Sequence, residues 1–252
     1  MSATVGEILE LVDSVAPFEL AEPWDNTGLL AGRPDDRTEA VLCALDLRTG
    51  VIEEALERDC GLIVTHHPIL FRGRKNLCET DGEGRLLCAL IRSRLSMIAA
   101  HTNYDNACPG VNDALAGALG LADVQSLESG ARIGGLRARP LGSFADDVAA
   151  ALGGAVRTYG PPERPVKTIA VLGGSGGDYV DIAIRSGADV YVTGEISHHK
   201  ALEALDAGLC VIEAGHAATE RPAVPLLVQR LKQAADERHV NVSFIASVAD
   251  VF

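Results

Sequence analysis

Short, continuous apolar runs alternate along the chain with segments whose apolar residues recur every three or four positions. The runs AVLCALD at 40–46 and GLIVT at 61–65 flank the amphipathic segment GVIEEALERDC at 50–60. Such runs predict strands that are buried on both faces, and the segment between them predicts a helix. Because a strand, helix, strand order needs a crossover, the two strands are expected to be parallel.

The same alternation continues on both sides of this unit, and a capping box of Thr4 and Glu7 predicts a helix at the start of the chain. Further helices are predicted at 82–95, 110–120, near 144–152, after 179, from 197 and over 218–237. Further strands are predicted at 96–105, 168–174, 189–194, 208–215 and 240–247. The pattern indicates an α/β protein with mixed or parallel sheets.

The periodicity dissolves between residues 121 and 142, where Gly, Ser and Arg are frequent. We interpret this segment as the join between two α/β lobes, residues 1–125 and 126–252. The segments EEALERDCGLIVTHH and LEALDAGLCVIEAGH, one in each half, both run from a helix through an apolar strand into histidine. The similarity of these two segments indicates either an internal duplication or a chance agreement, since Leu, Ala and Val are common residues.

Composition narrows the protein class. Acidic residues interrupt the apolar positions of the N-terminal segment, and no later run approaches the roughly 20 apolar residues of a membrane span. Six scattered cysteines without CxxC pairs indicate reduced thiols, so a cytoplasmic protein without membrane association is expected.

The net charge is −13, from 22 basic and 35 acidic residues, and we find no outstanding cluster of Lys or Arg. Such a chain repels nucleic acid, so a nucleic-acid partner is not expected. An anionic substrate would need positive charge from another source, such as bound metal ions.

Histidine is concentrated where strands are predicted to end. Six of the seven histidines closely follow a predicted strand: His66, His67, His101, His198, His199 and His216. Ligands of open parallel sheets gather outside the carboxyl ends of the strands, so these six are candidates for one shared site. Each taken alone is equally compatible with a hydrogen-bonded surface residue, and His239 in a charged loop is expected to have no special role.

Two histidines have a carboxylate four positions later: Asp105 follows His101, and Glu220 follows His216. On a helix, such a pair shares one face and could hold an ion. His66 and His67 are adjacent and would diverge in a regular strand, so they could serve one site only if the chain turns near Pro68.

Several residues near these candidates admit a simpler interpretation. Asp105 could be a turn residue, Glu220 a first-turn charge on a helix, and His198 and His199 helix caps. The Gly-rich segment GGSGGD at 173–178 could cradle a phosphate, but a tight structural turn is favoured because the P-loop lysine is missing. Cys108 could be a soft ligand or a redox-sensitive thiol, and a small buried residue is the favoured interpretation.

In this order the segments WDNTGLLAG, VTHHPILF, HTNYD, ARIGGL, VTGEISHH and AGHAATE resemble the Nif-three-like dinuclear metal centre proteins, the GTP cyclohydrolase 1 type 2 homologues. The resemblance covers nearly the whole chain. It implies two α/β halves with two metal ions between them and a toroidal homohexamer. Longer members carry an inserted domain, which this chain is too short to contain.

The resemblance assigns the metal ligands to His66, His67, Asp105, His216 and Glu220. It implies that His66 and His67 serve different ions and that Glu220 bridges both. His101 matches a family histidine near the site, as a catalytic proton carrier or a residue supporting the ligands. Ala217 departs from the bulkier aromatic residue that many relatives have there, which affects the expected pocket wall.

Two divalent ions about 3.5–4 Å apart activate a shared water and stabilise a developing oxyanion. The ligand set lacks cysteine, so zinc, manganese, iron, cobalt and nickel all remain open. The first hypothesis is a metal-dependent hydrolase of a small nucleotide-like substrate, with GTP suggested by resemblance and His101 moving protons. The alternative is a metal-binding hexameric regulator or interaction protein without catalysis.

Overall fold

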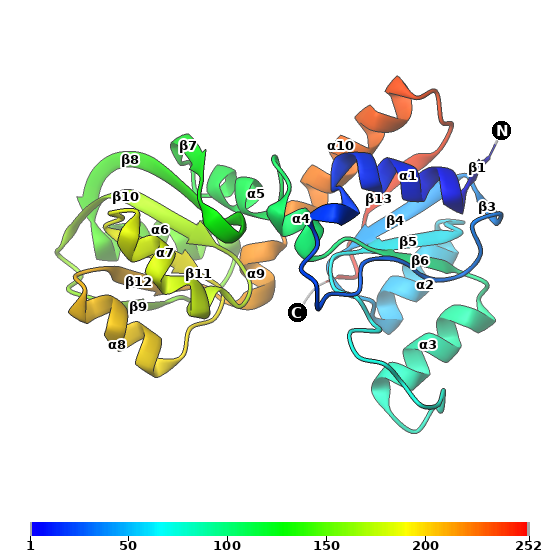
Figure 1. Cartoon of the computed structure of the whole chain (residues 1–252), viewed down its shortest axis with the longest axis horizontal. Coiled ribbons are helices and arrows are strands. Elements are labelled where there is room, and N and C mark those ends of the chain that lie inside the picture. The colour runs from blue at the N-terminus through cyan, green and yellow to red at the C-terminus, as the bar shows by residue number, and fades with distance from the viewer. Residues whose placement is uncertain (1, 251–252) are drawn as a thin grey trace. The chain divides into compact units, whose positions relative to one another are not determined.

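The computed structural model describes residues 2–250, which form two compact units. Of these residues, unit 1 comprises 2–107 and 224–250, and unit 2 comprises 108–223. Each unit has its own sheet with helices around it (Figure 1). The predicted class, two α/β lobes with mixed or parallel sheets, is confirmed.

Unit 1 is built on a five-stranded sheet in the order β13-β4-β5-β6-β2, with a separate β1-β3 pair. Only β2 runs antiparallel to its neighbour in the larger sheet. Its strands are β1 (Ala3–Thr4), β2 (Gly28–Ala31), β3 (Arg37–Thr38), β4 (Ala40–Ala44), β5 (Leu62–Thr65), β6 (Ser96–Ala99) and β13 (Ser243–Ala246). Its helices are α1 (Val5–Val15), η1 (Phe18–Leu20), α2 (Thr49–Glu57), α3 (Gly82–Arg92), α4 (Thr102–Asn106) and α10 (Ala223–Glu237).

Both faces of this sheet are covered, as the continuous apolar runs of its strands predict. Figure 1 shows α1 and α10 on one side of the sheet and α2 and α3 on the other. Alternate residues of a strand point to opposite faces, and in β4 both Val41 and Leu42 are fully buried. At the start of α1, Thr4 and Glu7 form the predicted capping box, since each side chain bonds the other residue's amide.

Unit 2 is built on a six-stranded mixed sheet in the order β7-β8-β10-β11-β12-β9, in which β10, β11 and β12 are parallel. Its strands are β7 (Ala122–Ser126), β8 (Arg132–Pro140), β9 (Arg157–Tyr159), β10 (Pro165–Leu172), β11 (Val190–Thr193) and β12 (Cys210–Glu213). Its helices are α5 (Val111–Ala118), η2 (Glu128–Gly130), α6 (Leu141–Leu152), η3 (Gly176–Tyr179), α7 (Val180–Arg185), α8 (His198–Asp206) and α9 (His216–Glu220). Core clusters lie on both faces, one with α5 and α6 and the other with α7 and α8.

The structure divides the chain at positions other than the predicted lobes 1–125 and 126–252. The last strand, β13, pairs in parallel with β4, with Ser243 opposite Ala40, so the C-terminal segment returns to unit 1. Local periodicity predicted this strand, but a parallel partner some 200 residues earlier leaves no local signal.

Residues 121–142 are not the irregular join that the sequence suggested, because most of them form β7 and β8 of the second sheet. Every residue of β7 is exposed, so this edge strand lacks an apolar pattern. Gly134 in β8 lets β7 approach, since a Cβ there would lie 3.0 Å from the carbonyl oxygen of Ala122. Most of the Gly, Ser and Arg residues that suggested a linker are therefore part of the edge strand β7 and of its neighbour β8.

The long helix predicted over 218–237 is two helices, α9 and α10. Pro222 follows α9 by two positions, and the residue before a proline is disfavoured in helical conformation. Within residues 2–250, none of the helices combines the length and apolar character that a membrane crossing requires.

Candidate metal centre

Three histidines of unit 1 lie beyond the carboxyl ends of two neighbouring parallel strands. β5 ends at Thr65, and the chain bends at His66 and His67, so adjacent rings can turn to the same side. His101 comes after β6, which pairs with β5. The bend that the histidine pair required is confirmed.

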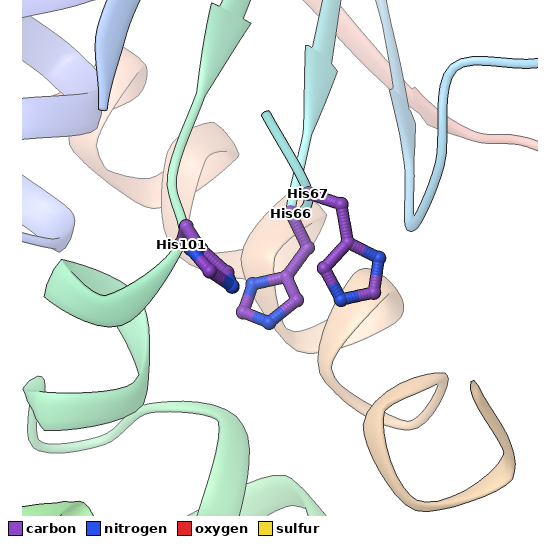
Figure 2. A group of neighbouring side chains, drawn as sticks. All are labelled: His66, His67 and His101. Atoms are coloured by element: carbon purple, nitrogen blue, oxygen red, sulfur yellow. The ribbon is translucent and has the colours of Figure 1, made fainter. Parts of the chain in front are cut away.

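The three rings converge, as Figure 2 shows. Ring centroids are 4.9 Å apart for His66 and His67, 5.1 Å for His66 and His101, and 5.5 Å for His67 and His101. One ring nitrogen from each lies within 4.8 Å of the others. Imidazoles at this spacing are close enough to serve as ligands of divalent cations.

Each of these rings is held through Nδ1 by an oxygen atom. The Nδ1 partners are the carbonyl of Ala100 for His66 at 2.9 Å, the carboxylate of Asp46 for His67 at 2.9 Å and the carboxylate of Asp25 for His101 at 2.8 Å. A carbonyl or carboxylate oxygen can only accept, so Nδ1 carries the proton and donates. Nε2 then keeps its lone pair, which is the arrangement found around metal-ligating histidines.

Asp25 is itself fixed on both sides. Its second oxygen accepts hydrogen bonds from the amide of Thr102 at 3.0 Å and from the hydroxyl of Thr102 at 2.5 Å. Burial acts to raise the pKa of Asp25, but the hydrogen bonds from His101 and Thr102 outweigh it and lower that pKa. The carboxylate is therefore ionised and oriented.

Burial lowers the pKa of His101 to about 4, and the neighbouring His66 ring acts in the same direction. The contact with Asp25 opposes this effect without cancelling it. His101 is therefore neutral at physiological pH, and its Nε2 can accept a proton or bind a cation.

Asp105 joins the same group from α4. Its Oδ1 lies 3.7 Å from Nε2 of His66, and its side chain is 28% exposed. Unit 1 therefore brings together His66, His67, His101 and Asp105, four of the six residues expected at the site.

The remaining two, His216 and Glu220, lie at the two ends of α9 in unit 2. Nε2 of His216 is 3.2 Å from Oε1 of the buried Glu220, so the expected shared helix face is confirmed. Nδ1 of His216 lies 3.2 Å from Oε1 of Glu195. His216 therefore repeats the pattern of unit 1, with an oxygen at Nδ1 and Nε2 turned toward a carboxylate.

The Gly-rich segment between β10 and η3 makes room for this pair. Gly174 has φ +63°, and a Cβ there would lie 2.2 Å from Oε1 of Glu220 and 3.3 Å from Nε2 of His216. The amide of Gly174 donates to the hydroxyl of Thr219 at 3.0 Å. These contacts support the structural interpretation of GGSGGD over a phosphate cradle.

Other candidates lie elsewhere. His198 and His199 are exposed in the first turn of α8, where they contact each other, and His239 is exposed after α10. Cys108, favoured as a buried residue, is exposed, so that interpretation is wrong. None of the six cysteines, all within the described part of the chain, forms a disulfide.

Three carboxylates that hold histidines, Asp25, Asp46 and Glu195, were not among the sequence candidates. Asp46 closely follows β4, and Glu195 closely follows β11. Both residues could have been found by the signal that identified the histidines, because they too lie just beyond the carboxyl ends of parallel strands. Asp25 lies in a segment without regular structure, so no periodic signal marks it.

Known proteins resemble this chain along nearly its whole length. The model of the Duf34/NIF3 family (NGG1p interacting factor 3) matches residues 3–250. Two relatives named GTP cyclohydrolase 1 type 2 homolog come from Clostridium acetobutylicum and Streptomyces coelicolor. The Clostridium protein is 31% identical, and the match covers 98% of this chain and 96% of the relative. The Streptomyces protein is 36% identical, and the match covers 93% of this chain and 87% of the relative. A crystal structure of a hypothetical protein from Staphylococcus aureus, 30% identical, gives a TM-score of 0.93 over 98% of this chain and 97% of that one.

Proposed function

The chain belongs to the Duf34/NIF3 family, as its motifs indicated, and on that premise we propose that it binds two divalent metal ions and hydrolyses a small nucleotide-like substrate. The proposed ligands are His66, His67, Asp105, His216 and Glu220. One observation carries the proposal: the converging imidazoles of His66 and His67 each have Nδ1 held by an oxygen, which leaves Nε2 for a cation.

The donor set fits divalent transition metals. It offers imidazole nitrogen and carboxylate oxygen without thiolate, and zinc, manganese, iron, cobalt and nickel all accept such ligands. When bound, a pair of such ions supplies Lewis acidity and an activated water. The two proposed carboxylate ligands do not neutralise two divalent ions, so the site can attract an anionic substrate.

His101 is proposed to move protons during hydrolysis. Asp25 holds its Nδ1 at 2.8 Å and so fixes the ring, whose centroid lies 5.1 Å from that of His66 and 5.5 Å from that of His67. A ring held in this way can take a proton at Nε2 and return it without reorienting. We propose nucleotide-like substrates, with GTP as the first example, because the relatives are named GTP cyclohydrolase 1 type 2 homologs.

Elemental analysis of protein purified without added metal tests the centre, with two equivalents per chain expected. Turnover of GTP and a panel of nucleotides is then measured with each candidate metal. Glu220→Gln is expected to lower both metal content and turnover, whereas Glu163→Gln, which changes an exposed carboxylate of unit 2, is expected to change neither. Bound metal without turnover of any substrate would instead favour the non-catalytic regulator.

We further propose that the chain assembles with itself into a homohexamer, which the family resemblance implies. Light scattering of the purified protein, with and without a chelator, measures the assembly size and its dependence on metal. A monomer under both conditions would contradict this part of the proposal.

A further inference from the structure

A pocket of about 680 Å³ lies in unit 1 beside the histidine group. Its walls are Asp25, Asn26 and the loop of residues 70–77 that follows β5 and the histidine pair. The side-chain amide of Asn26 donates to the carbonyl of Leu70 at 2.6 Å, which ties the loop to the segment that carries Asp25. Since Asp25 also holds His101, the pocket and the candidate metal site share a wall.

Two exposed aromatic residues stand at this boundary. Trp24 is 57% exposed and Phe71 is 46% exposed, although both are large apolar side chains. Their ring centroids are 5.8 Å apart, and they lie 6.3 and 6.1 Å from the ring of His101. Exposed aromatic faces beside a polar site are typical of surfaces on which a nucleobase stacks.

The same loop concentrates positive charge, since Arg72, Arg74 and Lys75 all line the pocket. Arg74 is neutralised by Asp81 at 2.8 Å and Glu83 at 3.0 Å. Among residues 2–250, neither Arg72 nor Lys75 has a carboxylate within ion-pair distance, and both are exposed. The sequence interpretation that no basic cluster stands out is therefore corrected: side chains do supply positive charge beside the site.

We propose that this pocket binds the non-reacting part of a phosphate ester that also carries an aromatic ring, such as a nucleoside monophosphate. The aromatic ring would lie against Trp24 and Phe71, and the phosphate would lie at Arg72 and Lys75. A phosphate pairs well with an arginine and a lysine that are not already paired with a carboxylate. In a chain of net charge −13, such a local pair determines which end of the substrate enters the pocket. The inference rests on the proposed function only in placing the reacting atoms at the histidines.

Trp24 is the only tryptophan in the chain, and its ring lies 5.8 Å from that of Phe71 in the pocket wall, so its fluorescence is sensitive to a ligand bound beside this ring pair. Purified protein is titrated with GMP, guanosine and ribose 5-phosphate. We expect GMP to change the Trp24 signal and to bind about tenfold or more tightly than guanosine, the size expected for a charge-assisted contact. Ribose 5-phosphate is expected to bind more weakly than GMP because it lacks the stacking ring.

Variants separate the two halves of the pocket. The double variant Arg72→Gln, Lys75→Gln should reduce GMP affinity to that of guanosine without changing guanosine binding. Phe71→Leu should weaken GMP and guanosine alike and leave ribose 5-phosphate unchanged. Arg33→Gln is the matched control, since Arg33 is an exposed arginine of unit 1 outside the pocket.

Equal affinities for GMP and guanosine, or a double variant that binds GMP as the unaltered chain does, would overturn the proposal. A Trp24 signal that follows protein concentration rather than GMP would also overturn it and indicate a protein interface. Metal content and turnover are measured separately. If GMP binds as expected but no substrate is turned over, only the proposed hydrolase activity is contradicted. If substrate is turned over but GMP and guanosine bind equally well, only the proposed role of this pocket is contradicted.

Discussion

Gly174 leaves the space that Glu220 occupies. A Cβ at Gly174 would lie 2.2 Å from Oε1 of Glu220, a distance that no pair of nonbonded atoms tolerates. The backbone of one loop thus sets the position of a proposed metal ligand on α9.

Gly174→Ala is therefore expected to displace Glu220 and to lower metal content below that of the unaltered protein. Alanine at position 174 would also add backbone strain of about 1–2 kcal/mol because φ there is +63°, and this strain must be separated from the clash. Gly187→Ala is the control, because Gly187 has φ +74° with open space around it. Elemental analysis measures the metal content of both variants. Equal metal contents in Gly174→Ala and Gly187→Ala would contradict the role assigned to Gly174.

Asp46→Asn removes the negative charge that accepts from Nδ1 of His67. Partners of this kind orient a ligating imidazole and raise its basicity, so we expect metal affinity to fall about 10- to 100-fold. A competition titration against a chelator measures the affinity. Asp35→Asn, which alters an exposed carboxylate of the same unit, should leave it unchanged.

His66→Ala and His67→Ala are each expected to deplete one of two metal positions more than the other, because the two histidines are proposed to serve different ions. Elemental analysis should find about one equivalent in each single variant if each ion depends mainly on its own histidine. His239→Ala is the control, since His239 is exposed after α10. Complete loss from either single variant would show that the two positions fill only together.

Glu54 on α2 ties down the C-terminal segment of unit 1. Its carboxylate accepts from the hydroxyl of Ser247 at 2.6 Å and from the amides of Val248 and Ala249 at 3.0 Å, and Arg58 lies 2.9 Å away. Burial acts to raise the pKa of Glu54, but these contacts outweigh it and lower that pKa. The ionised carboxylate is therefore favoured by folding.

A lowered folded-state pKa gives stability that is present above the unfolded value of about 4.3 and is lost as pH falls through the folded-state pKa. Glu54→Gln should therefore lower the free energy of unfolding at pH 7 by about 1–3 kcal/mol, and the difference should shrink in acid. Urea unfolding from pH 7 downward measures it. Glu57→Gln, which changes an exposed carboxylate on the same helix, should have little effect.

Much of the fold is encoded locally. Apolar runs such as that of β4, fully buried in the structure, identified the strands, and the capping box of Thr4 and Glu7 identified the start of α1. Part of the candidate site could be predicted in the same way. The histidines His66 and His67 at a strand end and the i, i+4 pair on α9 are both local patterns in the sequence. Elements without a burial pattern were missed, and the exposed edge strand β7 is the clearest example.

The sequence by itself determined which residues could act as ligands, because side-chain chemistry and periodicity are properties of neighbouring positions. Only the tertiary structure decided what holds them. Asp25 and His101 are 76 positions apart, and Asp46 and His67 are 21 apart, yet each pair forms a hydrogen bond. Such contacts depend on strand order and register in the sheet, which are set by packing over the whole unit rather than by any local segment.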